Sequence, residues 1–196
     1  MRPTEPSLLA KTPLTRLKTF SRARGGATAV EFALIALPFF MLLFSVLELG
    51  IMFIASTTID AATVAAAREI RTGQLQTTGT NTAAGFKSLV CDDMSWISTA
   101  DCMASMSLDV ETYPSFSSIQ VSSPPLTLQN KIDQTKLTYD AGSSCDIVLV
   151  RVYYPWTLLA PVIEPGLPDL GANQRLLTTA VAFRNENWAA GGPPCS

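Results

Sequence analysis

The chain has 196 residues, a net charge of −2 and no histidine, which leaves room for one small folded domain. Without histidine it cannot form a Ser-His-Asp or Cys-His catalytic group. Six of its 14 basic residues precede residue 26, beside the single acid Glu5, and the rest of the chain is acidic. A nucleic-acid-binding protein would carry its basic residues on the folded surface. The composition therefore argues against that class and suits a membrane protein with a cytoplasmic basic end.

An apolar segment follows a basic leader at residues 1–26. It extends from Ala27 to Ala55, a length of 29 residues, and includes 16 consecutive uncharged residues from Phe32 to Leu47. A helix needs about 20 apolar residues to cross the hydrocarbon core, where Pro38 is tolerated with a local kink. A soluble core helix of this length is rarely apolar on every face, and the apolar part of a cleaved secretory signal is shorter. We therefore predict a transmembrane helix at residues 27–55.

The basic leader sets the orientation of this helix. Positively charged flanks stay in the cytoplasm, so the chain after about Ser56 is expected outside it. Glu48 lies near the outer end of the apolar run. It can snorkel, face another subunit, or lie in the interface without a special partner.

A helical pattern continues beyond the membrane. Apolar positions recur at three- and four-residue spacing with alanine between them, which indicates an amphipathic helix. These positions are Ile59, Ala62 or Thr63, Ala66 and Ile70. One helix is expected from about Thr28 to Gln76, with residues 56–76 as a stalk and a stop at Gly73 or Gly79. One or two short helices are expected next, around Ala83–Val90 and Met94–Ala100.

Three later segments have the alternation or the β-branched and aromatic content of strands. They are Ser105–Tyr113, Asp146–Tyr154 and Leu176–Phe183. Pro155 is expected to end the second strand, because proline cannot donate to a sheet. In the third strand, Leu177, Val181 and Phe183 share one face.

These elements predict an α+β fold. A long N-terminal transmembrane helix continues as an amphipathic stalk and packs on a head at residues 77–188. The head contains a small antiparallel sheet of three or four strands. Residues 114–130 are expected to be a surface loop or edge strand, and residues 189–196 a tail.

Four cysteines follow the apolar segment: Cys91, Cys102, Cys145 and Cys195. An even number outside the cytoplasm argues for two disulfides, for which three pairings are possible. We predict Cys91–Cys102, which closes a short loop, and Cys145–Cys195, which would tie the tail to the sheet. A metal site is the competing interpretation, but the chain has neither a C-x-x-C pair nor histidine. We expect no metal and no cofactor.

Carboxylate pairs are the remaining catalytic candidates. Asp92 and Asp93 are more simply interpreted as residues that start a helix, and Asp109 and Glu111 as the polar face of a strand. No P-loop or dinucleotide-binding glycine motif is present, since Gly25–Gly26 precedes a membrane helix. We therefore expect no catalytic residues and no enzyme activity.

The junction between leader and apolar segment reads Gly25-Gly26-Ala27-Thr28-Ala29-Val30-Glu31-Phe32. A glycine ends a basic leader, a small residue follows, and a glutamate beside an aromatic residue lies five positions after the glycine. This pattern resembles the processing site of type IV prepilins, and the Glu-aromatic pair resembles the branch that serves tight-adherence (Flp) pili. Residues 67–74 are similar to the post-membrane helix of the TadE-like family, which includes TadE and TadF. Residues 139–188 resemble that family more loosely, with Asn187 where members often have proline.

The resemblance implies that an aspartic prepilin peptidase cleaves between Gly26 and Ala27 on the cytoplasmic side. Glycine lets a protease approach the backbone closely. A carboxylate near the membrane is costly unless it is paired. For Glu31, beside Phe32, the implied partner is the free α-amine that cleavage creates on a neighbouring subunit. The alternative is that Glu31 only favours the N-terminal end of its helix, which is worth about 0.3–1 kcal/mol.

The family further implies a minor pilin or pseudopilin of a type IVb tight-adherence pilus, acting in pilus assembly, surface adhesion and biofilm formation. Its partners would be the prepilin peptidase, a partner pseudopilin, the inner-membrane assembly platform, the major pilin and the lipid bilayer. It would lie in the bacterial inner membrane with its C-terminal domain in the periplasm. The alternative function is an uncleaved, signal-anchored domain that binds an envelope partner independently of pili.

Overall fold

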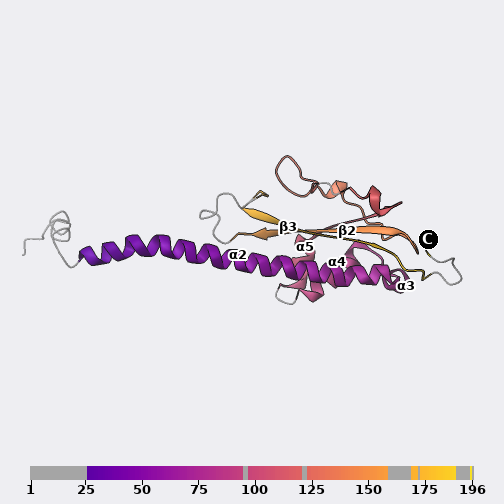
Figure 1. The fold of residues 1–196 in the computed structure, drawn as a ribbon, viewed down its shortest axis with the longest axis horizontal. Coiled ribbons are helices and arrows are strands. Elements are labelled where there is room, and N and C mark those ends of the chain that lie inside the picture. The colour runs from indigo at the N-terminus through magenta and orange to yellow at the C-terminus, as the bar shows by residue number, and fades with distance from the viewer. Residues whose placement is uncertain are drawn as a thin grey trace, which may run out of the picture. The chain divides into compact units, whose positions relative to one another are not determined.

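Figure 1 shows a computed structural model of the chain, which describes residues 26–94, 97–120, 123–158, 169–171, 173–188 and 195. The expected leader up to residue 25, and the expected tail apart from Cys195, lie outside the described residues. The chain divides into two compact units, residues 1–44 and 45–196. One long helix begins in the first unit and continues into the second.

That helix, α2, extends over 45 residues from Ala27 to Arg71 and contains Pro38. Nearly every side chain between Val30 and Phe44 is exposed. Within the described residues, α2 alone is long and apolar enough to cross a membrane. An apolar helix surface without protein cover is what a lipid environment favours.

Two glycines mark the ends of α2 and of the short helix that follows it. Arg71 is the last residue of α2, and a five-residue helix α3 covers Gln74–Thr78. Gly73 (φ +76°) and Gly79 (φ +72°) flank α3 in the left-handed conformation that glycine adopts without a steric penalty. One of the two predicted stops, Gly73, is therefore confirmed, whereas the extension of the same helix to Gln76 was wrong, because the left-handed Gly73 separates α2 from α3.

Two further helices carry the first cysteine pair. Helix α4 covers Ala83–Asp93, beginning after Thr82, whose side chain accepts a hydrogen bond from the Gly85 amide. This confirms the first short helix, but Asp92 and Asp93 end α4 rather than start a helix.

Helix α5 covers Thr99–Ser105, and the expected helix at Met94–Ala100 was therefore wrong. Met94 is fully buried and follows the end of α4. The start of α5 is favoured by Asp101 in its first turn, whereas the side chain of Ser98, before the helix, makes no capping hydrogen bond.

The sheet has three antiparallel strands in the order β1–β2–β3: Ser107–Tyr113, Ile147–Thr157 and Gln174–Arg184. Val150 of the central strand is opposite Val110 on β1 and Val181 on β3. Strand β1 begins two residues later than expected, because α5 continues to Ser105. Residues 114–120 and 123–130 contain no named strand, and Phe116–Ser118 there form a short 3-10 helix, η2.

Strand β2 does not end at Pro155, as the sequence predicted, but continues to Thr157. Pro155 is paired with Leu176 of β3, whereas β1 begins opposite Tyr153 and does not reach this level. Proline lacks only its own N–H, so it is tolerated where one side of the strand has no neighbour. At Pro155, β2 is an edge strand on the β1 side.

The hydrophobic core lies between one face of this sheet and the helices. On α2, the predicted buried stripe is confirmed, and both Ala62 and Thr63 are buried within it. The α2 residues of the core cluster are Ala55, Ile59, Ala62, Ala66 and Ile70. The sheet contributes alternate residues of β2, such as Val148 and Val150, and α4 contributes Phe86 and Val90. The α+β architecture predicted from the sequence is therefore present.

Candidate functional site

Gly26 directly precedes the first residue of α2, Ala27. A Cβ atom added at Gly26 would have no neighbour within 4 Å, and its backbone is not in the left-handed region. Packing and backbone conformation therefore do not explain a glycine at this position. In contrast, Gly73 has a positive φ and would bring its Cβ within 2.5 Å of the Trp188 ring.

Glu31 is the fifth residue of α2, so it lies beyond the first helical turn, which contains no acidic residue. The stabilising effect of the helix dipole falls off within that first turn, which weakens the alternative role for Glu31. Glu31 is exposed, and 71% of Phe32 is exposed. No ion pair of Glu31 occurs within the described part of the chain.

Glu48 has a different environment, because only 4% of it is exposed. It belongs to the second unit, where Ala55, two turns further along α2, is also buried. Glu48 therefore faces the folded domain, and the two-unit division places the start of that domain near Ser45.

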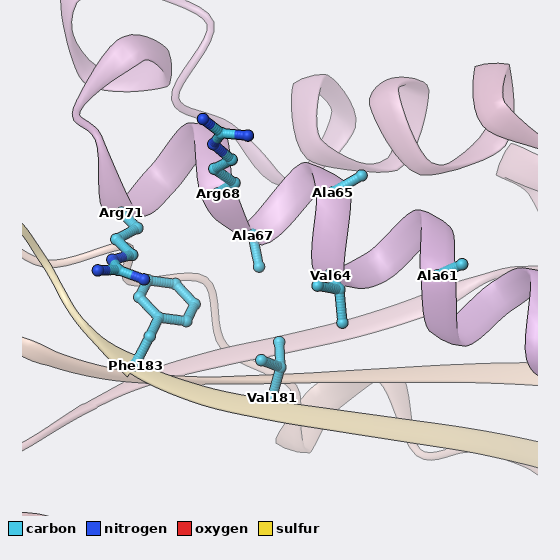
Figure 2. A pocket seen from close by; sticks show the side chains of 8 residues that line it. All are labelled: Ala61, Val64, Ala65, Ala67, Arg68, Arg71, Val181 and Phe183. Atoms are coloured by element: carbon cyan, nitrogen blue, oxygen red, sulfur yellow. The ribbon is translucent and has the colours of Figure 1, made fainter.

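An open groove of about 560 Å³ lies between α2 and the edge strand β3 (Figure 2). Its lining is mostly alanine, valine and phenylalanine, with two arginines: Ala61, Val64, Ala65, Ala67, Arg68, Arg71, Val181 and Phe183. Val64 and Ala67 point toward the strand, and Val181 and Phe183 point toward the helix. Val64 is 52% exposed. The groove therefore presents apolar side chains to its surroundings.

The two arginines of this groove differ in their contacts. Arg71 forms an exposed ion pair with Glu186 (Nε–Oε1 3.3 Å), and the Glu186 amide donates to the Arg71 carbonyl at 2.8 Å. Exposed ion pairs contribute little to stability. Arg68 makes no ion pair with any described residue.

Asp109 and Glu111 lie on the same face of β1, the polar face that the sequence predicted, and share one arginine of β2. Arg151 Nη2 is 2.7 Å from Asp109 Oδ2 and 3.1 Å from Glu111 Oε2. Asp109 also accepts hydrogen bonds from the amide and hydroxyl of Thr138, and Glu111 accepts one from the Tyr113 hydroxyl at 2.5 Å. That hydrogen bond, followed by burial, raises the pKa of Tyr113. These carboxylates serve to join β1, β2 and residue 138.

Two disulfides have the predicted pairing. Cys91 of α4 is bonded to Cys102 of α5, and both are buried. Cys145, just before β2, is bonded to Cys195 near the end of the chain. Within the part of the chain that the structure describes, no group of three or more histidine, cysteine, aspartate or glutamate residues is arranged to hold a metal ion.

The described part of the junction motif, Gly26 to Phe32, lies at the start of an exposed apolar helix. A comparison with protein families finds a similarity over this helix. Residues 26–68 match the family of TadE-like proteins. The TadE-like match begins at Gly26 and ends at Arg68, which lines the groove, so it covers most of α2 and does not reach the sheet. Neither a curated protein nor a solved structure matches the chain.

The junction residues could be found from the sequence, whereas the groove could not. Gly26, Glu31 and Phe32 are close in sequence, and a motif is enough to find them. The groove joins α2 to strand residues more than 110 positions later, such as Val181. No local pattern predicts that contact, so sequence reasoning missed the groove.

Proposed function

We propose that the chain is a minor pilin or pseudopilin of a tight-adherence pilus, anchored in the inner membrane by α2 and processed between Gly26 and Ala27. The observation that carries the proposal is the TadE-like match, which begins at the expected cleavage glycine. As such a component, the protein would act in pilus assembly and through it in surface adhesion.

The dimensions of α2 support a single membrane crossing. Within the predicted span of 27–55, residues 28–47 would form the part in the hydrocarbon core, because Glu48 and Ala55 beyond them are buried by protein. These 20 residues would span about 30 Å at ~1.5 Å per residue, the thickness of that core. The basic leader would stay in the cytoplasm by the positive-inside rule. Disulfides form in oxidising compartments, so the two cysteine pairs favour a periplasmic head.

Processing gives the junction residues distinct roles. The structure offers no internal reason for glycine at position 26, which favours recognition of this residue by another protein, here the prepilin peptidase. Cleavage would make Ala27 the new N-terminus. The exposed Glu31 would then pair with the α-amine of a neighbouring subunit, which offsets the cost of a carboxylate at the membrane.

A stripe along α2 supports a second anchored subunit as partner. Exposed positions recur at alternating three- and four-residue spacing, the pattern by which parallel helices pack. They are Leu47, Gly50, Ile54, Thr57, Ala61, Val64 and Arg68. The stripe is continuous from the apolar region into the groove. Because a partner pseudopilin would enter the same membrane in the same orientation, its helix could lie parallel to this stripe.

Processing is tested by intact mass and N-terminal sequencing of the protein extracted from its host membrane. We expect a chain that starts at Ala27, and an uncleaved chain for Gly26→Val. Gly50→Val is the matched control, because Gly50 also has no neighbour within 4 Å of an added Cβ, and it should be cleaved normally. A full-length native chain, in a host that processes its major pilin, would exclude a pseudopilin. It would leave the anchored binding domain as the function.

Assembly is tested separately with Glu31→Gln, which keeps the shape of the side chain and removes its charge. This variant should be cleaved but should no longer copurify with the sheared pilus or its assembly platform. Glu69→Gln changes a partly buried glutamate on the same helix and should behave as the native chain. Equal copurification of both variants would refute the proposed role of Glu31.

A further inference from the structure

A hydrogen-bonded turn presents one leucine entirely to solvent. In residues 125–133, Leu126 and Ile132 form an antiparallel bridge, and the Thr127 amide donates to the Lys131 carbonyl at 2.8 Å. The Asn130 amide donates to the Thr127 carbonyl at 3.0 Å. Leu128, at the tip, is 100% exposed. A single exposed leucine is common, so its significance depends on where the turn lies.

The turn lies at the end of the sheet where β1 and β3 begin. The Gly171 amide donates to the Asn130 carbonyl at 3.0 Å, and Leu170 is bridged to Gln174, the first residue of β3. On the other side, the Gln134 side chain donates to the hydroxyl of Ser107, the first residue of β1, at 2.6 Å. The two connections fix the turn at this end.

The same end lies beside the first part of α2 in the second unit. Thr179 of β3 donates to Asp60, and further along both elements the Glu186 amide donates to Arg71. Strand β3 and α2 therefore run in the same direction, as Figure 1 also shows. Gln174 precedes Thr179 by about 16 Å at ~3.3 Å per strand residue, which equals about 11 helical residues. The start of β3 is thus level with α2 near Glu48.

That level is also where α2 would leave the bilayer. Residues 28–47 fill a hydrocarbon core of about 30 Å, and the side of α2 away from the head remains apolar and exposed at Ile51, Phe53 and Ile54. Lys131, at the base of the turn, is exposed. An apolar tip beside a cation matches the interface between acyl chains and phosphate headgroups.

We propose that the turn at residues 126–131 is a second membrane contact, in which Leu128 enters the headgroup region of the outer leaflet of the inner membrane. The contact would hold the head in a fixed orientation about α2. It rests on the membrane anchor of the proposed function, and it uses a residue that has no packing role in the fold.

The experiment places a nitroxide spin label on single cysteines introduced into the full-length chain, with both native disulfides intact. The chain is reconstituted in vesicles of phosphatidylethanolamine and phosphatidylglycerol. Collisions with oxygen, which partitions into lipid, are compared with those of a water-soluble nickel chelate. The test variant is Leu128→Cys, and the matched control is Phe116→Cys, 52% exposed and near the opposite end of β1. Leu42→Cys, 67% exposed on α2, reports on the anchor itself.

We expect several-fold less nickel collision and more oxygen collision at residue 128 than at residue 116. Equal nickel accessibility at 128 and 116, with residue 42 shielded by lipid, would overturn the lipid contact and leave the anchor intact. Nickel accessibility at residue 42 would instead overturn the anchor. Shielding of residue 128 only after other envelope proteins are added would replace the lipid contact with a protein partner.

Discussion

Replacement of Arg151 by methionine should strongly destabilise the head, because it leaves Asp109 without its cation. Asp109 exposes only 3% of its side chain and Arg151 12%, with 2.7 Å between the charged atoms. Removing one partner of a buried ion pair typically costs about 3–5 kcal/mol. The amide and hydroxyl of Thr138 still donate to Asp109 in the variant. We therefore expect a loss near the lower end, about 3 kcal/mol.

The matched control is Arg175→Met, which makes the same change in an exposed pair. Arg175 Nε lies 3.4 Å from Asp169 Oδ2, with side chains 41% and 46% exposed. An exposed pair contributes about 0–1 kcal/mol. Glu111→Gln should also cost little, because 34% of this side chain is exposed.

The assay is urea unfolding of the full chain in detergent, followed by tryptophan fluorescence. The double variant Asp109→Asn/Arg151→Met should recover part of the loss, since it no longer buries an unpaired charge. If Arg151→Met lowers the free energy of unfolding by no more than Arg175→Met does, the ion pairs of Arg151 with Asp109 and Glu111 do not stabilise the sheet. The carboxylates would then need another explanation.

Three further changes test other parts of the head. Thermal unfolding of the two alanine-pair variants, Cys145→Ala/Cys195→Ala and Cys91→Ala/Cys102→Ala, should show a larger contribution from Cys145–Cys195 than from Cys91–Cys102. The expected values are about 4 against 3 kcal/mol from loop entropy, because the sequence separations are 50 and 11. The reverse order would contradict this. Gly73→Ala should lower the free energy of unfolding by about 2–3 kcal/mol, because the residue has a positive φ and the Trp188 ring lies against it. Gly79→Ala also has a positive φ but meets open space, so it should lower the free energy of unfolding by about 1 kcal/mol. Equal losses would show that the ring contact is unimportant. Burial raises the pKa of Tyr139 to about 12, so its stabilising effect is complete below the unfolded pKa near 10 and is lost as pH rises toward 12. The ultraviolet difference titration between the native chain and Tyr139→Phe should show this late ionisation, and an ordinary tyrosine titration would refute it.

Local sequence patterns were enough to predict the features that depend on neighbouring residues. The apolar run predicts the first part of α2 as a membrane helix, because a helix that is apolar on every face needs lipid or protein to cover its surface. The three- and four-residue spacing of Ile59, Ala66 and Ile70 identified the buried face correctly. Strand periodicity located β1, β2 and β3 to within three residues at each end. The cysteine pairs followed from loop length and the expected compartment.

Features that depend on contacts between distant segments became visible only in the folded chain. Pro155 stays within β2 because β1 does not reach its level, a fact of register rather than of proline itself. Arg151 joins both carboxylates because antiparallel pairing sets it opposite Asp109. The groove at Val64, and the position of Leu128 beside the start of β3, arise from segments distant in sequence. Local composition fixes whether a segment is helix, strand or membrane span, whereas contacts across the chain require the fold that brings them together.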